Sequence, residues 1–311
     1  MLLVFSSLLS LFLTWFSIKK LLPYFRNNFI SYPNERSLHK KPIPLGGGIS
    51  IIIFSTIFLS FSKNYIPIYC LPLGIIGVLD DKYNIDRKYR FFIQIITSII
   101  LLFFSETKLI LNFTDVFLIN FLCIFLIIFL ATGIINFINF MDGVDGLVGI
   151  SMSIIFIFAG INFYNDIWPL ISSISGFLIW NWKPAKIFMG DSGSTFLGAF
   201  YVGLIFNAQN FYDQIGLILI GTPLLADSLF CLFYRAIKKQ SIFDAHNQHL
   251  YQRLAKSGWS HSQVSILYAS AITFLGFVFI NKNLYYLIIS ALITIFLGLF
   301  IHKKYTHQEI K

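Results

Sequence analysis

Apolar runs of roughly 15 to 22 residues recur along this chain from end to end, each close to the ~20 residues that a helix needs to cross a bilayer. Charged residues make up only 12% of the chain, whereas an ordinary soluble domain carries about 25%. The three cysteines all lie inside apolar runs and form no metal-ligand or disulfide spacing. We therefore predict an all-α integral membrane protein with one domain over residues 1–311.

The sequence predicts a bundle of about 11 transmembrane helices (about 10 to 11). Their expected ranges are 2–18, 47–62, 65–79, 91–105, 116–136, 146–163, 166–180, 193–209, 214–236, 262–281 and 284–302. Of the 23 Lys and Arg residues, all but Lys63, Lys108 and Lys282 fall in alternate connections and in the C-terminal tail. By the positive-inside rule that face is cytoplasmic, with the N-terminus outside and the C-terminus inside. Most acidic residues fall on the same face, so we expect the active site there.

Residues 136–147, N-F-I-N-F-M-D-G-V-D-G-L, end one of the longest apolar runs. Two amides and two carboxylates stand here at three-residue steps: Asn136, Asn139, Asp142 and Asp145. Residues three apart lie on neighbouring faces of a helix end, and the interleaved glycines let the backbone approach a ligand closely. Asn, Asp and Gly also terminate helices, but that alternative explains neither the number of polar groups nor their step. The pattern predicts a polar site.

An acidic pair, Asp80 and Asp81, directly follows the predicted span 65–79, and several basic residues come after it. Adjacent carboxylates at a helix C-terminus oppose the helix macrodipole, so they do not stabilise that helix. A metal ion, a substrate cation or a proton-transfer role would offset this unfavourable interaction. We predict that the pair is functional.

A third polar segment begins at Asn181 and includes F-M-G-D-S-G-S just before another span. Asp191, the acidic residue of this turn, is interpreted as a helix N-cap, as a ligand at the membrane surface, or as both. Phe188 lies in the same polar loop, where an exposed ring can stack on a base or a sugar.

Two loops on the same face carry histidine. His39 lies among prolines, glycines and basic residues beside a helix start, which suits an anion; a plain positive-inside anchor is the alternative. His246 and His249 stand three residues apart, and Arg253 continues that face. Two histidines alone make a poor metal site, so we predict phosphate contacts, with solvated loop histidines as the alternative.

Asp227 lies inside the predicted span 214–236. A carboxylate within a membrane span is a functional candidate by default. The sequence identifies no partner for it, so we rank it below the residues named above.

Four motifs in this order resemble the MraY/WecA superfamily of polyprenyl-phosphate N-acetylhexosamine-1-phosphate transferases (glycosyltransferase family 4). They are the D-D pair, N-x-x-N-x-x-D-G-x-D-G-L, F-M-G-D-S-G-S and the paired-His loop. The resemblance covers residues 34 to 254. The ending D-A-H-N-Q-H-L-Y-Q-R-L is more similar to the WecA and WbpL branch, which starts O-antigen and related glycans. It departs from the MraY branch, whose corresponding loop has a run of consecutive histidines, and this argues against a muramyl-pentapeptide substrate.

The resemblance implies a Mg²⁺-dependent phospho-N-acetylhexosamine transferase, with Mn²⁺ as a possible substitute. It would transfer a sugar 1-phosphate from a UDP-N-acetylated sugar (GlcNAc, or a relative such as FucNAc or QuiNAc) to undecaprenyl phosphate and release UMP. The product would start an O-antigen or another cell-envelope polysaccharide. The implied location is the bacterial inner membrane, with a homodimer possible. No nucleic-acid partner is expected, because the net charge of +9 forms no basic block.

The resemblance also assigns roles to the motif residues. Asp191 matches the main metal ligand and the Asn139 amide oxygen the second. The family's acidic pair, proposed to orient or deprotonate the lipid phosphate, corresponds to Asp80 and Asp81. The remaining expected site residues are the pocket carboxylates Asp142 and Asp145, the uridine contacts Asn181 and Phe188, the loop histidines His246 and His249, and the further substrate contacts His39, Asn136 and Arg253.

Two other classes are weighed against a transferase. A membrane transporter of a polar or anionic solute would also carry polar residues in a multi-span bundle, but transport sites lie near the midplane with inverted repeats. This chain shows no repeat and gathers its acids at one face. An intramembrane aspartyl protease would need a G-x-G-D motif, but Phe188 replaces the first glycine.

Overall fold

The computed structural model describes residues 2–33, 37–105, 116–240 and 248–306, which are almost entirely helical. The helices are α1 (Leu2–Asn28), α2 (Gly47–Phe61), α3 (Ile66–Tyr69), α4 (Leu71–Tyr83), α5 (Arg87–Phe103), α6 (Phe117–Phe140), α7 (Leu147–Asn162), α8 (Trp168–Asn181), α9 (Gly190–Asn207), α10 (Phe211–Ile220), α11 (Thr222–Ile237), α12 (Leu250–Lys256), α13 (His261–Ile280) and α14 (Leu284–Thr306). Strands β1 (Ile30–Ser31) and β2 (Ile43–Pro44) form a small antiparallel ribbon that pairs Ile30 with Pro44.

The described helices fit a multi-pass membrane protein. By length and composition, α1, α6, α13 and α14 are long and apolar enough to cross a bilayer. The pair α10 and α11 forms a fifth span if its two halves, bent by 67°, are taken together. Every predicted span corresponds to a helix or to two consecutive helices, but the total of about 11 and the sidedness stay predictions.

Three details differ from the sequence prediction. Helix α1 continues past residue 18 to Asn28. Lys19 and Lys20 lie within it and extend their charged ends over the rings of Trp15 and Phe16 at 5.2 and 5.6 Å. Two predicted spans are broken: 65–79 at Cys70 into α3 and α4, and 214–236 at Gly221 into α10 and α11. The short ribbon and α12 were not predicted, since neither is long enough to show hydrophobic periodicity.

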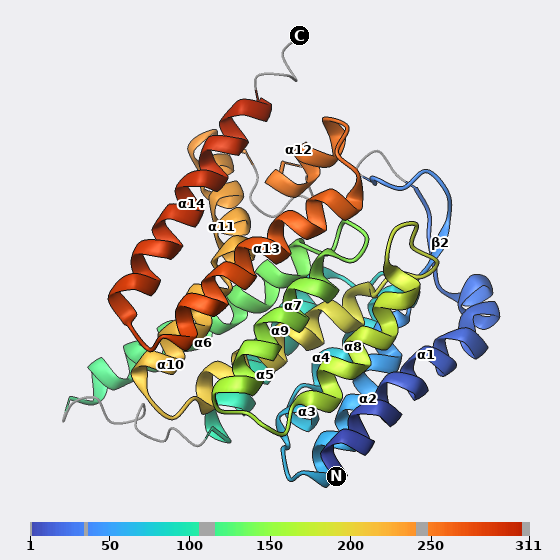
Figure 1. Ribbon diagram of the computed structural model, residues 1–311, viewed down its shortest axis with the longest axis horizontal. Coiled ribbons are helices and arrows are strands. Elements are labelled where there is room, and N and C mark those ends of the chain that lie inside the picture. The colour runs from blue at the N-terminus through green and yellow to red at the C-terminus, as the bar shows by residue number, and fades with distance from the viewer. Residues whose placement is uncertain (1, 34–36, 106–115, 241–247, 307–311) are drawn as a thin grey trace.

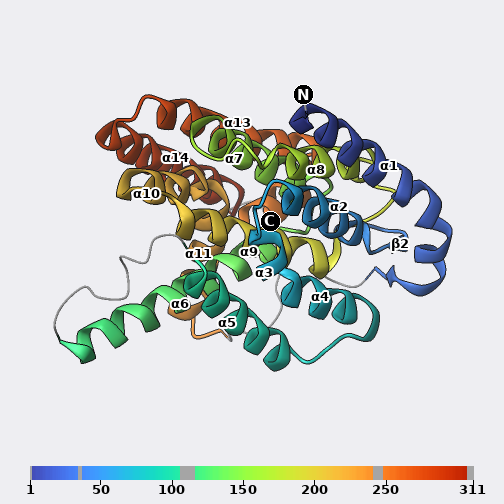
Figure 2. The ribbon, with the colours of Figure 1, turned by 90° about the horizontal axis from the view of Figure 1, so that it is seen from below.

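Helix α9 lies at the centre of the bundle, with nearly every residue from Ser192 to Phe206 buried. It contacts α2, α4, α5 and α6. Helix α6, by contrast, extends beyond the other helices (Figure 2), and its first half exposes large apolar side chains such as Phe117 and Phe125. Burial therefore decreases outward from α9, as expected for a bundle whose outer helices face lipid.

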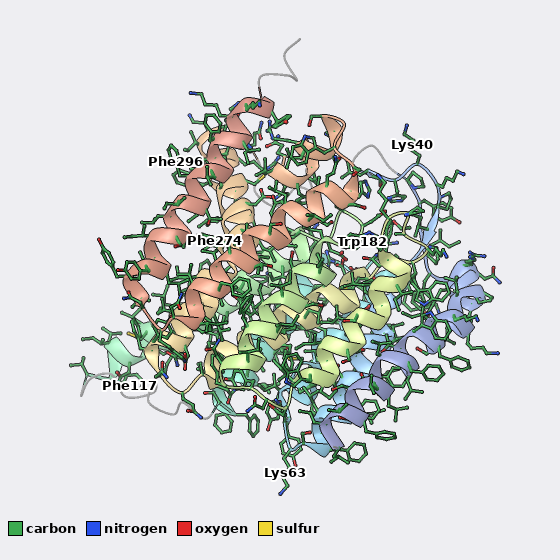
Figure 3. The ribbon with its side chains drawn as sticks, in the orientation of Figure 1. Lys40, Lys63, Phe117, Trp182, Phe274 and Phe296 are labelled. Carbon is green, nitrogen blue, oxygen red and sulfur yellow. The ribbon has the colours of Figure 1, made fainter. Side chains whose placement is uncertain are left out.

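The two ends of the bundle carry different elements of the chain. The start of α1 lies at one end, whereas β2, α12 and the end of α14 lie at the other (Figure 1). Figure 3 places Lys63 at the first end and Lys40 at the second, with Trp182 nearer the second and Phe274 and Phe296 along one side. The end that holds Lys40 is the predicted cytoplasmic end.

We expect cysteine labelling to reveal this sidedness. In a chain whose native cysteines are replaced by alanine, Lys88→Cys should react with an impermeant maleimide only after the membrane is opened. Both Lys88 and the control residue Ser62 are exposed, so accessibility to the reagent does not limit labelling. Ser62→Cys should react in intact cells, because it lies beside Lys63 on the predicted outer side. Labelling of Lys88→Cys from outside would reverse the topology.

Candidate active site

The acidic pair at the end of α4 lies against the start of α9. The Asp81 carboxylate accepts hydrogen bonds from the backbone N–H groups of Asp191 (2.8 Å) and Ser192 (3.4 Å) and from the Ser192 hydroxyl (2.9 Å). It thus caps a helix that begins more than 100 residues later, where the helix dipole favours a negative charge. The α9 N-terminus offsets the unfavourable position of Asp81 at the end of α4.

Gly190 makes this approach possible. Its φ of +78° lies in the left-handed region, which side chains other than glycine adopt at a cost. A Cβ atom at this position would lie 2.3 Å from the Asp81 Oδ2 atom. The glycine before Asp191 is therefore required both by the backbone conformation and by the Asp81 carboxylate.

The second carboxylate of the pair has a different partner. The Arg90 guanidinium, on α5, contacts both Asp80 (2.5 Å) and Asp191. One cation thus joins α4, α5 and α9 and compensates the repulsion between two carboxylates. Sequence reasoning missed Arg90, although it belongs to the basic cluster after the D-D pair.

Asp191 is not a helix cap, so that interpretation was wrong. Helix α9 begins at Gly190, its N-cap residue is Met189, and no side chain caps it from within its own sequence. The capping oxygens come from Asp81, which leaves the Asp191 side chain to face Arg90. Asn139 lies at the neighbouring end of α6, where its Oδ1 atom accepts a hydrogen bond from the hydroxyl of Ser194 (2.6 Å) on α9.

Three carboxyl groups of this cluster have raised pKa values. Burial raises the pKa of Asp142 to about 8, helped by the nearby charges of Asp191, Asp81 and Asp145. Burial, then the charge of Asp191, raises the pKa of Asp81 to about 7. Burial, followed by hydrogen bonding with Asp191 and its charge, raises the pKa of Asp80 to about 6, although Arg90 opposes the shift. The negative charges of these carboxylates repel one another and help to raise the pKa values, which is typical of a site that receives a cation.

Asp145 occupies a second part of the site, between α13 and the loop after α8. Its Oδ1 atom lies 3.0 Å from Nδ1 of His261, and its Oδ2 atom accepts the N–H of Ala185 (3.2 Å). The Asn181 amide braces this region by bonding to the backbone of Gly146 and Ile187. Sequence reasoning missed His261; its position at a polar helix start was the one available signal.

His39 and Phe188 are brought together from distant loops. Their ring centroids lie 5.1 Å apart in an edge contact. Among the described residues the His39 Nε2 atom is buried without a hydrogen-bond partner, and burial lowers the pKa of this imidazole. The Phe188 backbone bonds to Pro44 and Gly47, so Phe188 is held in place and only partly exposed. A buried ring nitrogen without a partner is a candidate substrate contact.

The triple glycine of the first loop has a packing reason. A Cβ atom on Gly48 would lie 2.4 Å from Cα of Gly193, and one on Gly47 would lie 2.4 Å from the Phe177 ring. The glycines let the start of α2 lie directly against α9, so they position the loop and do not themselves indicate a ligand.

Some predicted residues lie elsewhere or have other partners. Asn136 and Gln94 exchange amide hydrogen bonds (2.7 and 3.1 Å) between α6 and α5, so a substrate contact by Asn136 stays a prediction. His249 is only 3% exposed, so it is not a solvated loop histidine. Arg253 is also buried and donates from Nε to the Gln248 carbonyl (3.0 Å). His246 lies outside the described residues.

Hard oxygen donors therefore meet at one end of a membrane helix bundle. In the described part of the chain no three His, Cys, Asp or Glu side chains converge closely enough to hold a metal ion by themselves. Arg90 supplies the positive charge between Asp80 and Asp191. Fold and site define a multi-pass membrane protein with an acidic site for polar ligands at the bundle end.

Comparison with known proteins identifies the family. The family model of glycosyl transferase family 4 matches residues 64–207. A Bacillus subtilis (strain 168) protein named probable undecaprenyl-phosphate N-acetylglucosaminyl 1-phosphate transferase is 31% identical over 80% of this chain and 75% of its own length. Undecaprenyl-phosphate alpha-N-acetylglucosaminyl 1-phosphate transferases from Thermotoga maritima and Escherichia coli K12 are 28% and 26% identical, over 73% and 79% of this chain and 74% of each relative. The chain belongs to glycosyl transferase family 4, within the MraY/WecA superfamily.

Proposed function

We propose that this protein transfers N-acetylhexosamine 1-phosphate from a UDP-sugar to undecaprenyl phosphate and releases UMP. The observation that carries the proposal is the cluster of Asp80, Asp81, Asp142 and Asp191, which α4, α6 and α9 assemble at the polar end of the bundle. The family and its relatives supply the reaction class. The proposed location is the cytoplasmic side of the bacterial inner membrane, with about 11 spans.

The reaction joins two anions, which explains the kind of site it needs. A phosphate oxygen of undecaprenyl phosphate bonds to the phosphorus that carries the sugar, and the bond from that phosphorus to UMP breaks. Phosphoryl transfer depends on positioning and on neutralising charge more than on covalent chemistry by the protein. Arg90, already between two carboxylates, is placed to contribute positive charge near the reacting phosphates.

The oxygen ligands of this site suit Mg²⁺ or Mn²⁺. Asp191 and the Asn139 amide oxygen are hard ligands, and Mg²⁺ is commonly bound by one or two protein carboxylates with substrate phosphates and water completing its shell. When bound, the ion would neutralise the diphosphate of the UDP-sugar. The raised pKa values of Asp81 and Asp142 indicate that several negative charges lie close together here, where a cation would neutralise them.

The other residues of the site have separate proposed roles. Asp81 is committed to capping α9, so Asp80 is the better candidate to orient the lipid phosphate. Asp142 accepts no hydrogen bond within the described residues, and its pKa near 8 lets it hold or release a proton at neutral pH. His39 and Phe188 are proposed to hold the uridine, with Asp145 placed by His261.

The preferred donor is proposed to be UDP-N-acetylglucosamine, because the relatives' names carry that sugar. UDP-FucNAc and UDP-QuiNAc are the related alternatives, and an O-antigen or another envelope glycan is the proposed product pathway. A transporter is not favoured, since the chain's relatives are transferases.

The purified full-length chain in detergent tests this proposal. We expect UMP release from UDP-N-acetylglucosamine only when undecaprenyl phosphate is present. EDTA should abolish it, and Mg²⁺ or Mn²⁺ should restore it. Uptake of intact UDP-sugar into proteoliposomes without UMP formation would instead support the transporter, and inactivity with every UDP-N-acetylated sugar would contradict the transferase.

A further inference from the structure

The carboxylate of Asp227 lies inside the bundle, and its side chain is only 4% exposed. It is the one acidic residue placed in the interior of a predicted span, away from its ends, and a buried charge is costly unless it is hydrogen-bonded. It takes no part in the acidic cluster described above. The structure supplies the partners that the sequence did not reveal.

These partners come from α12, from its N-cap residue His249 and from α13. The backbone N–H of Leu250 donates to Oδ1 of Asp227 (2.9 Å), and that of Tyr251 donates to Oδ2 (3.4 Å). The Tyr268 hydroxyl, on α13, donates to Oδ2 (2.7 Å), and Nδ1 of His249 lies 3.6 Å from Oδ1. One side chain of α11 therefore binds the first backbone groups of α12 and fixes them beside α13.

Helix α12 depends on such contacts, because seven residues are far too few for a stable isolated helix. Its Tyr251 reaches back to the turn between α6 and α7, residues 141–146: the hydroxyl donates to the Phe140 carbonyl (2.9 Å). A Cβ atom on Gly143 would lie 2.4 Å from that hydroxyl oxygen. Tyr251 thus rests directly on the turn that carries Asp142 and leads to Asp145.

We propose that Asp227 is a positioning residue, which docks α12 so that Tyr251 braces the turn bearing Asp142 and Asp145. This inference rests on the proposed function for its kinetic consequences but not for the docking itself. Asp227 acts through α12 and touches no substrate. It differs from an ordinary core residue because its loss should alter the turn between α6 and α7 more than the bundle.

The test compares Asp227→Asn, Tyr251→Phe and the double variant in the full-length chain. Asp213→Asn is the matched control, because Asp213 is also a buried carboxylate (5% exposed), paired with Lys282 and Asn210 away from α12. Docking is measured by the rate of limited tryptic cleavage after Arg253 and Lys256, followed by mass spectrometry. Positioning is measured by kcat and by the KM values for UDP-sugar and undecaprenyl phosphate.

We expect Asp227→Asn to speed cleavage in α12 about tenfold, because local opening becomes easier. Its kcat should fall roughly 10- to 100-fold, as for loss of an orienting partner, while the KM for undecaprenyl phosphate changes less than about twofold. Adding Tyr251→Phe should lower kcat little further, since both changes remove the same brace. Asp213→Asn should leave cleavage and kcat unchanged.

Unchanged cleavage in Asp227→Asn would overturn the docking, whatever the chain's activity. Faster cleavage with normal kcat would overturn the positioning role, as would full additivity of the two substitutions. If the unmodified chain releases no UMP, the proposed function fails, yet the cleavage rates still decide whether Asp227 docks α12.

Discussion

Asp191→Asn is expected to abolish nearly all UMP release while leaving the fold intact. The carboxylate faces Arg90 and caps no helix, so the amide, which keeps its size, removes a full charge from the proposed metal and phosphate site. Loss of such a preorganised charge costs roughly 10² to 10³ in turnover. Any remaining activity should require far more Mg²⁺, and Mn²⁺ binding followed by electron paramagnetic resonance should weaken in parallel.

A matched control is Asp86→Asn on the same side of the molecule. Asp86 caps α5 through the N–H of Lys88 (3.1 Å), and Asn caps about as well as Asp, so activity should stay normal. Both variants should unfold within a few degrees of the unmodified chain, about what a surface change produces. Near-normal turnover of Asp191→Asn at ordinary Mg²⁺ would move the metal role to Asp80, Asp81 or the Asp142 and Asp145 pair.

Gly190→Ala is expected to have the second large effect, although it removes no functional group. The added methyl group would meet the Asp81 carboxylate at 2.3 Å, on a backbone with φ of +78°. Such strain costs about 1 to 3 kcal/mol, and relieving it must separate Asp81 from the start of α9. We expect a drop in melting temperature of about 2 to 10 °C and loss of at least about nine-tenths of the activity.

Gly133→Ala is the control that separates this effect from the general effect of replacing a helical glycine by alanine. Gly133 lies in α6, where a Cβ atom added to it would meet no other described atom within 4 Å, and alanine is the better helix former by roughly 0.5 to 1 kcal/mol. That variant should be fully active and as stable as the unmodified chain, or slightly more so. If Gly190→Ala matched it in melting temperature and activity, the contact between Asp81 and α9 would not matter.

The polar motifs could be predicted because each is local. Three polar segments stand at the ends of apolar runs: the pair Asp80 and Asp81, the turn with Asp142 and Asp145, and the segment with Asp191. Each run is predicted to form a spanning helix, so alternate connections between the runs are expected on the same face of the bundle. Arg90 and His261 were missed because one basic or imidazole group among many carries no periodic signal.

The partners of individual groups could not be predicted in this way. A cap of its own helix was one of the two interpretations of Asp191 because it is the nearest explanation along the chain, whereas the cap is Asp81, 110 residues away. A solvated loop position, the alternative weighed for His249, is excluded because the docking of α12 against Asp227 buries this side chain; its phosphate contact stays a prediction.

Hydropathy, basic-residue placement and motif order therefore determined by themselves that this is a helical membrane protein with an acidic site at one end. These are properties of short segments, because lipid requires apolar helices of a set length and water retains the charged connections. Only the tertiary structure decided which charge faces which. Arg90 meets Asp191 across 101 residues, and Asp81 meets the start of α9, because such pairings depend on how α4, α5 and α9 pack together and not on the local sequence of any one of them.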